Sequence, residues 1–206
     1  IKGQVYHASN HLPMLVYWPK GIPQKGVKNF DFVNFIDLAP TFLEVAGIDG
    51  EAKGMQQIEG KSMLSLIKSG KSKYDSSRNH VLIGKERHDI GRPDDAGYPI
   101  RGIVTERYLY VYNFEPDRWP AGNPETGYLN CDGGAIKTEL IKDGKTEAYK
   151  YWSLNFGKRP QEELYDIVKD PDCMYNLISS GEGRKVADKL RKQMFEELKS
   201  QGDHRM

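Results

Sequence analysis

The chain has 206 residues, enough for one large domain or two small ones at roughly 150 residues per domain. A hydrophobic content of 38% and an aromatic content of 11% exclude a disordered or collagen-like polymer. No apolar stretch approaches the roughly 18 residues that a membrane-spanning helix needs. Since 30 basic residues face 29 acidic ones, no broad charge favours nucleic acid or anionic lipid. We therefore expect a globular chain that binds any anion through local geometry.

The first apolar elements lie near the N-terminus. Residues 13–19 form an apolar run between two prolines, which is typical of a strand buried on both faces. Residues 30–47 then carry apolar side chains mostly three and four residues apart. Asp37 is placed to cap a helix and Gly47 to end it. The pattern predicts a central strand followed by a helix of about ten residues.

A second strand candidate, residues 80–84, runs directly into the polar cluster Lys85-Glu86-Arg87-His88-Asp89. A short amphipathic turn at residues 62–68 precedes it. The carboxyl ends of core strands are where open α/β sheets place their ligand sites. The cluster is therefore a candidate site.

The rest of the chain is richer in β pattern. Residues 101–114 read as an antiparallel hairpin around Thr105-Glu106-Arg107, and residues 163–168 as a further strand. Between them, residues 115–134 form a long loop rich in Pro, Gly, Asn and Asp, and long ordered loops are frequently functional. Residues 184–199 show the spacing of a packed amphipathic helix.

These elements predict an α/β fold in two parts. We expect residues 1–97 to form the edge of an α/β layer, and residues 98–206 to form a small antiparallel sheet covered by the terminal helix. The early strand and helix cannot complete a doubly wound sheet alone, which indicates a missing half. The two cysteines, Cys131 and Cys173, form no C-x-x-C pattern, so they favour neither zinc nor a dithiol centre, and a disulfide or two buried thiols remain open.

Several short pieces in a fixed order resemble the carboxyl-terminal half of a sulfatase of the alkaline-phosphatase superfamily. The piece Tyr98-Pro-Ile-Arg, after a His-bearing cluster and ahead of a hairpin, is most similar to the heparan N-sulfatase (sulfamidase) branch. The other matching pieces are Lys2-Gly-Gln-Val-Tyr, His11-Leu-Pro-Met-Leu-Val-Tyr-Trp-Pro, Ile36-Asp-Leu-Ala-Pro-Thr-Phe-Leu-Glu-Val-Ala-Gly, Gly60-Lys-Ser-Met, Glu163-Leu-Tyr-Asp, Asp170-Pro and Asn176-Leu.

The resemblance implies a sulfatase whose chemical centre lies outside this chain. In this family a formylglycine, made from Cys or Ser in a Cys/Ser-x-Pro/Ala-x-Arg motif, attacks sulfur while a divalent cation, usually Ca²⁺, polarises the sulfate. The sequence contains no such motif, and the acidic metal ligands of the family precede the Lys2 element. We therefore expect a fragment that binds no cofactor or metal itself, is inactive alone, and pairs with an N-terminal catalytic half.

Six residues are candidates for the site of that parent enzyme. Lys2 matches the family's sulfate-binding cation and would stabilise charge on the sulfuryl oxygens. Arg87 and His88 offer a fork-shaped donor and a titratable ring for a sulfated sugar. His11, Arg101 and Trp119 are further substrate-binding candidates, although a loop histidine, an ion-pair partner and a loop anchor are the respective alternatives.

The expected substrate is a sulfated glycan of heparin or heparan type, without nucleic acid or membrane partners. The family resemblance places the parent protein in the periplasm, the lysosome or outside the cell, and no signal peptide is visible within this chain. Two alternatives stay open: a phosphoesterase or phosphonate hydrolase of the same superfamily, and a non-catalytic carbohydrate-binding module.

Overall fold

The structure, a computed structural model, describes residues 3–50, 53–142 and 149–206. It divides into two compact units, one made of Ile1–Leu12 and Leu82–Glu197 and the other of Pro13–Val81 and Leu198–Met206. The expected division of the parent fold between residues 97 and 98 stays a prediction. The two units are described separately below.

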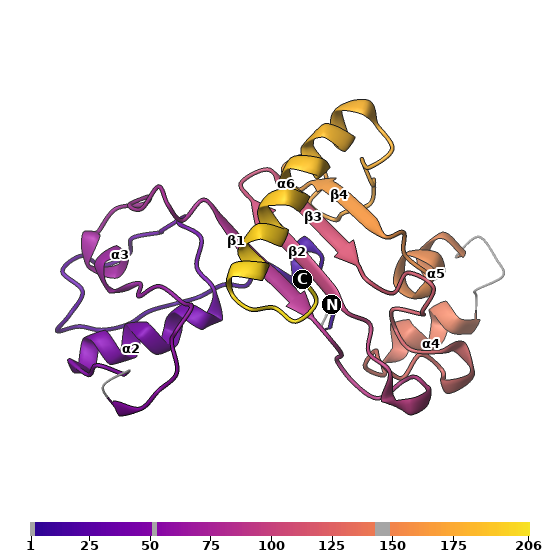
Figure 1. Cartoon of the computed structure of the whole chain (residues 1–206), viewed down its shortest axis with the longest axis horizontal. Coiled ribbons are helices and arrows are strands. Elements are labelled where there is room, and N and C mark those ends of the chain that lie inside the picture. The colour runs from indigo at the N-terminus through magenta and orange to yellow at the C-terminus, as the bar shows by residue number, and fades with distance from the viewer. Residues whose placement is uncertain (1–2, 51–52, 143–148) are drawn as a thin grey trace. The chain divides into compact units, whose positions relative to one another are not determined.

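A four-stranded sheet forms the centre of the first unit. Its order is β1-β2-β3-β4, with β1 at His80–Lys85, β2 at Ile100–Thr105, β3 at Tyr108–Asn113 and β4 at Glu162–Asp166 (Figure 1). The pairs β2–β3 and β3–β4 are antiparallel, with Ile103 opposite Tyr110 and Val111 opposite Glu163. The predicted hairpin and the strand near residue 163 are confirmed.

The core of this unit lies under helix α6, Gly181–Ser200, which crosses the sheet in Figure 1. The Phe195 ring packs edge-on against Tyr112, with ring centroids 5.2 Å apart, and stacks with Phe114 at 6.5 Å. The side chains below it are apolar and fully buried, because alternate strand residues and one helix face meet there. They include Ile103, Tyr110, Leu164 and Met194, while Leu109 and Val111 are fully buried on the opposite face of the sheet.

The first unit also contains short helices: α1 at His7–Asn10, α4 at Ala135–Lys142 and α5 at Tyr149–Phe156. The 3-10 turns η3, Pro93–Asp95, and η4, Pro124–Thr126, lie in the loops after β1 and β3. Tyr128 stacks on Phe156 with ring centroids 4.6 Å apart, so the long loop has its own apolar anchor.

The second unit is built around a capped helix. The 3-10 turn η1, Phe35–Asp37, leads into α2, Leu38–Ala46, and α3 follows at Leu64–Ser69. Asp37 closes a capping box with Asn34 and also pairs with the buried Arg78 at 2.8 Å. Gly47 ends α2 in the left-handed region at φ 66°, so the predicted helix and its terminator are confirmed.

The strand predicted at residues 13–19 is wrong for this structure. Residues 13–18 have no regular secondary structure, and Leu15 and Tyr17 are 89% and 81% exposed. An extended apolar run becomes a buried strand only when neighbouring strands take up its backbone hydrogen bonds. None of the described residues pairs with it, so the run stays open.

The remaining sequence predictions agree with the structure in outline. The observed architecture is a mixed α/β fold with a small antiparallel sheet and a packed C-terminal helix, as predicted. Strand β1 differs in one respect, since it lies at the sheet edge and is half-buried. Cys131 and Cys173 are both free thiols, and no helix of the described residues is long and apolar enough to cross a membrane.

Candidate functional site

The polar residues that follow β1 are held in place by one buried amide. Asn130 is 3% exposed, and its side-chain oxygen accepts hydrogen bonds from the backbone N–H groups of His88 at 3.3 Å and Asp89 at 2.5 Å. Its amide nitrogen donates to the Pro120 carbonyl at 3.2 Å. One side chain thus fixes the loop after β1 against the long loop, because buried backbone groups need partners.

Arg92 ties the same two loops together from within. Its guanidinium is buried and donates to the carbonyl oxygens of Trp119 at 3.0 Å, Pro120 at 3.0 Å and Ala96 at 3.3 Å. Burial, followed by the nearby Arg118 charge, lowers the pKa of Arg92. Its guanidinium also lies 5.6 Å from the Tyr98 ring centroid. A cation whose partners are neutral groups adds positive potential to its surroundings.

The N-terminal segment meets the loop after β1 at Gly3. A β-carbon added to Gly3, which has φ +78°, would lie 2.9 Å from the His88 ring atoms Cδ2 and Cγ. The ammonium of Lys85 also donates a hydrogen bond to the Gly3 carbonyl. Gly3 therefore lies against two residues of the polar cluster. Lys2 lies outside the described residues.

Lys85 has an unusual environment for a lysine. Burial, and secondarily the Arg92 charge, lowers the pKa of its ammonium to about 8, while Cys131 acts in the opposite direction. Among the described residues, no carboxylate pairs with it. We refer to Gly3, Lys85, His88, Arg92 and Asn130 together as the β1 cluster.

His88 has a partly buried ring and one acidic neighbour. Its Nε2 atom lies 3.6 Å from Asp132 Oδ1, with 20% of the His88 side chain exposed. The ring can therefore be oriented by Asp132 on one side while Gly3 covers its carbon edge. A partly buried imidazole in such a setting can donate a hydrogen bond to a ligand oxygen.

The other cations predicted for this site have partners within the protein. Arg87 pairs with Asp95, and both side chains are exposed. Arg101 is buried and donates to Glu86 at 2.6 Å and to the Ile100 carbonyl at 3.0 Å. Its geometry in this structure is that of the ion-pair alternative, holding Glu86 at the base of the cluster.

Trp119 serves the long loop as an apolar contact. Its ring lies edge-on to Tyr128 and Trp152, with centroid distances of 6.3 Å to each. The ammonium of Lys158 lies 5.5 Å from its ring centroid. The indole is half-buried, so the loop-anchor role is visible while part of the ring faces solvent.

His11 is exposed at the end of α1, and its ring lies 4.9 Å from that of His7. Partial burial, followed by the His11 charge, lowers the pKa of His7. No contact in the structure joins His11 to the β1 cluster, so its substrate role stays a prediction. Within the described ranges, no group of three His, Cys, Asp or Glu side chains could hold a metal ion.

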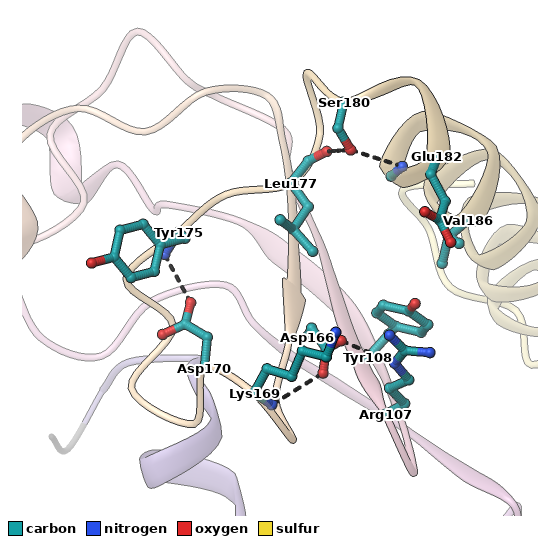
Figure 2. A pocket seen from close by; sticks show the side chains of 11 residues that line it. Arg107, Tyr108, Asp166, Lys169, Asp170, Tyr175, Leu177, Ser180, Glu182 and Val186 are labelled. Carbon is teal, nitrogen blue, oxygen red and sulfur yellow. Dashed lines mark hydrogen bonds and ion pairs between the residues drawn. The ribbon is translucent and has the colours of Figure 1, made fainter.

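A separate pocket of about 350 Å³ lies where α6 begins (Figure 2). Two of its acidic groups have partners within the protein: Arg107 pairs with Asp166 at 2.9 Å, and Asp170 accepts the backbone N–H of Tyr175 at 2.8 Å. Ser180 caps the helix by accepting the Gly183 N–H at 2.9 Å. We call this hollow the α6 pocket.

Sequence reasoning missed three residues of the β1 cluster. Asn130 and Arg92 were not singled out, because their roles depend on contacts with backbone 27 to 42 residues away. Lys85 stood inside the predicted polar cluster, but its burial is not readable from sequence. Its position as the last residue of a strand was the available signal.

Comparison with known proteins identifies the class. The family model described as "N-sulphoglucosamine sulphohydrolase, C-terminal" matches residues 2–121. An ulvan-active sulfatase from Formosa agariphila is 30% identical over 192 residues, which are 93% of this chain and 34% of that protein. A second ulvan-active sulfatase of the same organism is 25% identical over 209 residues, covering 98% of this chain and 31% of its own length.

A solved structure shares the fold. The complex of BT4656 with its substrate, D-glucosamine-2-N,6-O-disulfate, aligns with a TM-score of 0.57 at 18% identity, over 91% of this chain and 28% of that one. Because the family model covers more than half of the chain, the chain belongs to the C-terminal N-sulphoglucosamine sulphohydrolase family of sulfatases. It spans about a third of the length of the curated relatives described above.

Proposed function

We propose that this chain is the C-terminal part of a sulfatase that hydrolyses sulfate esters or sulfamates of a sulfated glycan. The observation that carries the proposal is that Gly3 lies against the His88 ring. A β-carbon added to Gly3 would be 2.9 Å from the nearest ring atoms of His88. This contact brings the segment that follows Lys2 to the polar cluster after β1. A shared substrate surface between the family's sulfate-binding lysine and the His88 loop requires this proximity.

The substrate we propose is a glucosamine-containing glycan of heparin or heparan type. The family description names N-sulphoglucosamine, and the structural relative BT4656 was solved with a glucosamine disulfate. Its two ulvan-active relatives support a sulfated polysaccharide more generally. Arg and His side chains suit such a ligand because sulfate oxygens accept charge-assisted hydrogen bonds.

In this proposal the chain supplies the rim of the pocket. Lys2 binds a sulfate oxygen, and His88 and Arg87 contact the sugar or its anionic groups. Arg101 supports them through Glu86 in addition to its predicted contact with substrate. His11 and Trp119 lie further out, where an exposed imidazole and a partly exposed indole could meet neighbouring sugar units.

The nucleophile and the metal belong to a preceding part of the polypeptide in this proposal. A formylglycine would supply the attacking oxygen and Ca²⁺ would polarise the sulfate, and we assign neither to the described residues. The second unit supports such a partner, because it exposes a large apolar set that water disfavours. The set comprises Leu12 of the neighbouring segment and, within the unit, Met14, Leu15, Val16, Tyr17, Phe30, Phe35, Ile36 and Phe42.

We further propose that the parent protein acts outside the cytoplasm, in the periplasm, in a lysosome or as a secreted enzyme. Polymeric sulfated glycans are substrates that an exported enzyme meets directly. Cell fractionation with an antibody against this chain tests that location.

The central experiment uses the protein produced from its complete gene in cells that make formylglycine. Sulfate release from N-sulfoglucosamine, glucosamine 6-sulfate, heparin fragments and ulvan is followed by ion chromatography. We expect release from at least one substrate, with His88→Ala lowering kcat/KM at least tenfold. His204→Ala, a histidine of the C-terminal segment outside the cluster, is the matched control and is expected to behave as wild type.

Three results would contradict the proposal. If the folded protein carries formylglycine but releases no sulfate from any of these substrates, the proposed sulfatase activity is wrong. Release of phosphate from phosphate esters instead would favour a phosphoesterase of the same superfamily. Stable, monodisperse binding of heparin fragments by the 206-residue chain alone, with no catalytic partner encoded, would favour a carbohydrate-binding module.

The fragment role has its own test in amide hydrogen exchange. If a preceding part of the polypeptide covers the second unit, residues 13–18 exchange rapidly in the 206-residue chain and slowly in the protein from the complete gene. Equal exchange in both forms would show that nothing covers this segment.

A further inference from the structure

Among the described residues, the partly buried ammonium of Lys85 has no carboxylate partner of the kind that a desolvated cation normally has. It donates a hydrogen bond to the neutral carbonyl of Gly3, and burial is the main cause of its lowered pKa of about 8. A charged group taken out of water is costly unless an opposite charge or a metal compensates for it. A single hydrogen bond to the Gly3 carbonyl compensates for only part of the free energy that the Lys85 ammonium loses on desolvation.

The charged groups around Lys85 do not supply the missing anion. Arg92 is positive and lowers the pKa of Lys85 further, and it is already bound to three carbonyl oxygens. The acid beside His88, Asp132, lies 3.6 Å from His88 Nε2 and is not among the groups that shift the pKa of Lys85. Cys131 acts on Lys85 in the favourable direction, as a weaker third influence after burial and Arg92.

The same residues are held rigidly, as a binding site requires. Asn130 and Arg92 fix the backbone on both sides of the loop, and Gly3 lies against the His88 ring. Lys85 and His88 are therefore two donors on one supported loop, three residues apart. An ammonium has three N–H groups, so one bond to Gly3 leaves two for a ligand.

We propose that Lys85 is a substrate-binding residue that, beside His88, binds an oxyanion carried by the sugar, either a sulfate or a carboxylate. This inference rests on the proposed glycan-sulfatase function and deepens it by assigning an anion subsite. A sulfate or carboxylate oxygen of the sugar would supply the negative charge that no described carboxylate supplies to Lys85. A neutral sugar hydroxyl would not compensate for it.

The subsite predicts a particular pH dependence. The groups facing the ammonium are the Gly3 carbonyl, Arg92, Cys131, and His88 with its neighbour Asp132. Because Lys85 loses its proton above about pH 8, affinity for an anionic sugar should fall as pH rises through that value. A bound anion would raise the pKa of Lys85 and shift the fall to higher pH.

The test uses the protein from its complete gene and three variants. Lys85→Met keeps the side-chain length without charge, and Lys85→Arg keeps the charge. Lys189→Met changes an exposed lysine of α6 and serves as the matched control. Dissociation constants are measured calorimetrically for glucosamine 6-sulfate, N-sulfoglucosamine, glucuronate and unsubstituted glucosamine.

We expect Lys85→Met to weaken binding of at least one anionic sugar by about 10- to 100-fold, the range for a lost charge-assisted hydrogen bond. Glucosamine binding should not change, Lys85→Arg should recover part of the affinity, and Lys189→Met should match wild type. The probe that loses affinity identifies the source, since glucuronate carries only a carboxylate and glucosamine 6-sulfate only a sulfate.

Two outcomes would overturn the inference. One is Lys85→Met binding all four sugars as Lys189→Met does. The other is Lys85→Met losing affinity equally for glucosamine, because that would indicate a purely structural role. Failure of the proposed function gives a different result. If the function is wrong, the wild-type protein releases no sulfate. If only the anion subsite is wrong, wild type releases sulfate and Lys85→Met binds all four sugars with unchanged affinity.

Discussion

The β1 cluster and the α6 pocket both gather charged side chains in the first unit, but they treat those charges in opposite ways. In the α6 pocket, Arg107 meets Asp166 at 2.9 Å, and Asp170 is engaged by the backbone of its own loop. In the β1 cluster, Lys85 donates to the Gly3 carbonyl oxygen and pairs with no carboxylate of the described residues. The Arg107 cation of the pocket is therefore engaged in an ion pair, whereas the Lys85 charge has no carboxylate beside it among the described residues.

This contrast shows that the surface cavity and the charge suited to bind a ligand can lie at different places in one protein. The α6 pocket has a volume of about 350 Å³, while its arginine, Arg107, is already paired with Asp166. The β1 cluster contains the histidine that the family resemblance selects and a partly buried ammonium that has no acid partner among the described residues. Binding sites tend to hold electrostatic interactions that are not yet made, because the ligand is meant to complete them.

The largest effect is expected from Arg92→Met in the β1 cluster. The variant leaves the carbonyl groups of Trp119, Pro120 and Ala96 without their donor. Loss of buried hydrogen bonds of this kind costs about 2 to 4 kcal/mol in unfolding free energy. Chemical denaturation of the 206-residue chain measures it. A variant as stable as wild type would show that the two loops are held by other contacts.

The next effect concerns the charge of Lys85. Its pKa is about 8 in the fold and near the ordinary 10.5 when unfolded, so the unfolded chain binds more protons between these values. Stability contributed by this group therefore rises with pH across that window, by up to about 3 kcal/mol. Lys85→Met should lack this rise and be the more stable form at pH 7. Parallel pH–stability curves for the two proteins would contradict the prediction.

A smaller effect is expected from Gly3→Ala. The substitution places a β-carbon 2.9 Å from the His88 ring at φ +78°, where alanine is strained. We expect a loss of about 1 to 2 kcal/mol, together with a shift of the His88 ring resonances. Gly47→Ala is the matched control, because Gly47 has φ +66° and open space around it. Equal losses at both glycines would show that the His88 contact adds nothing to backbone strain.

The smallest effect is expected from Arg107→Met in the α6 pocket. About half of the Arg107 side chain is exposed, and exposed ion pairs contribute little to stability. The variant should match wild type in denaturation midpoint and in binding of glucosamine 6-sulfate. A loss of affinity comparable to that of Lys85→Met would make the α6 pocket, rather than the β1 cluster, the anion site.

Local sequence signals predicted the elements that are stabilised locally. The cap residues and Gly47 defined α2, the hairpin followed from alternating residues around Glu106-Arg107, and apolar spacing located α6. The prediction at residues 13–19 was wrong for a physical reason. An apolar run specifies burial, but the strands that would bury it must come from elsewhere, and none of the described residues supplies them.

The sequence predicted where the candidate site lies, but not which contacts its residues make. The polar run after β1 identified the loop with His88 and Lys85 from strand position alone. The features that distinguish its residues are long-range: Arg101 is engaged by Glu86, and Asn130 reaches across to His88. Whether a cation is paired depends on the three-dimensional neighbours, which spacing along the chain does not encode.

The close approach of Gly91 and Gly122 has a consequence for engineering. A β-carbon on Gly91 would lie 2.7 Å from the Asn130 nitrogen and 3.3 Å from the Gly122 Cα, and Asn123 donates to the Gly91 carbonyl at 2.8 Å. The two loops thus interlock through their backbones. Transplanting the histidine loop alone into a related enzyme would leave it unsupported, so a graft that aims to transfer selectivity must carry both segments as one cassette.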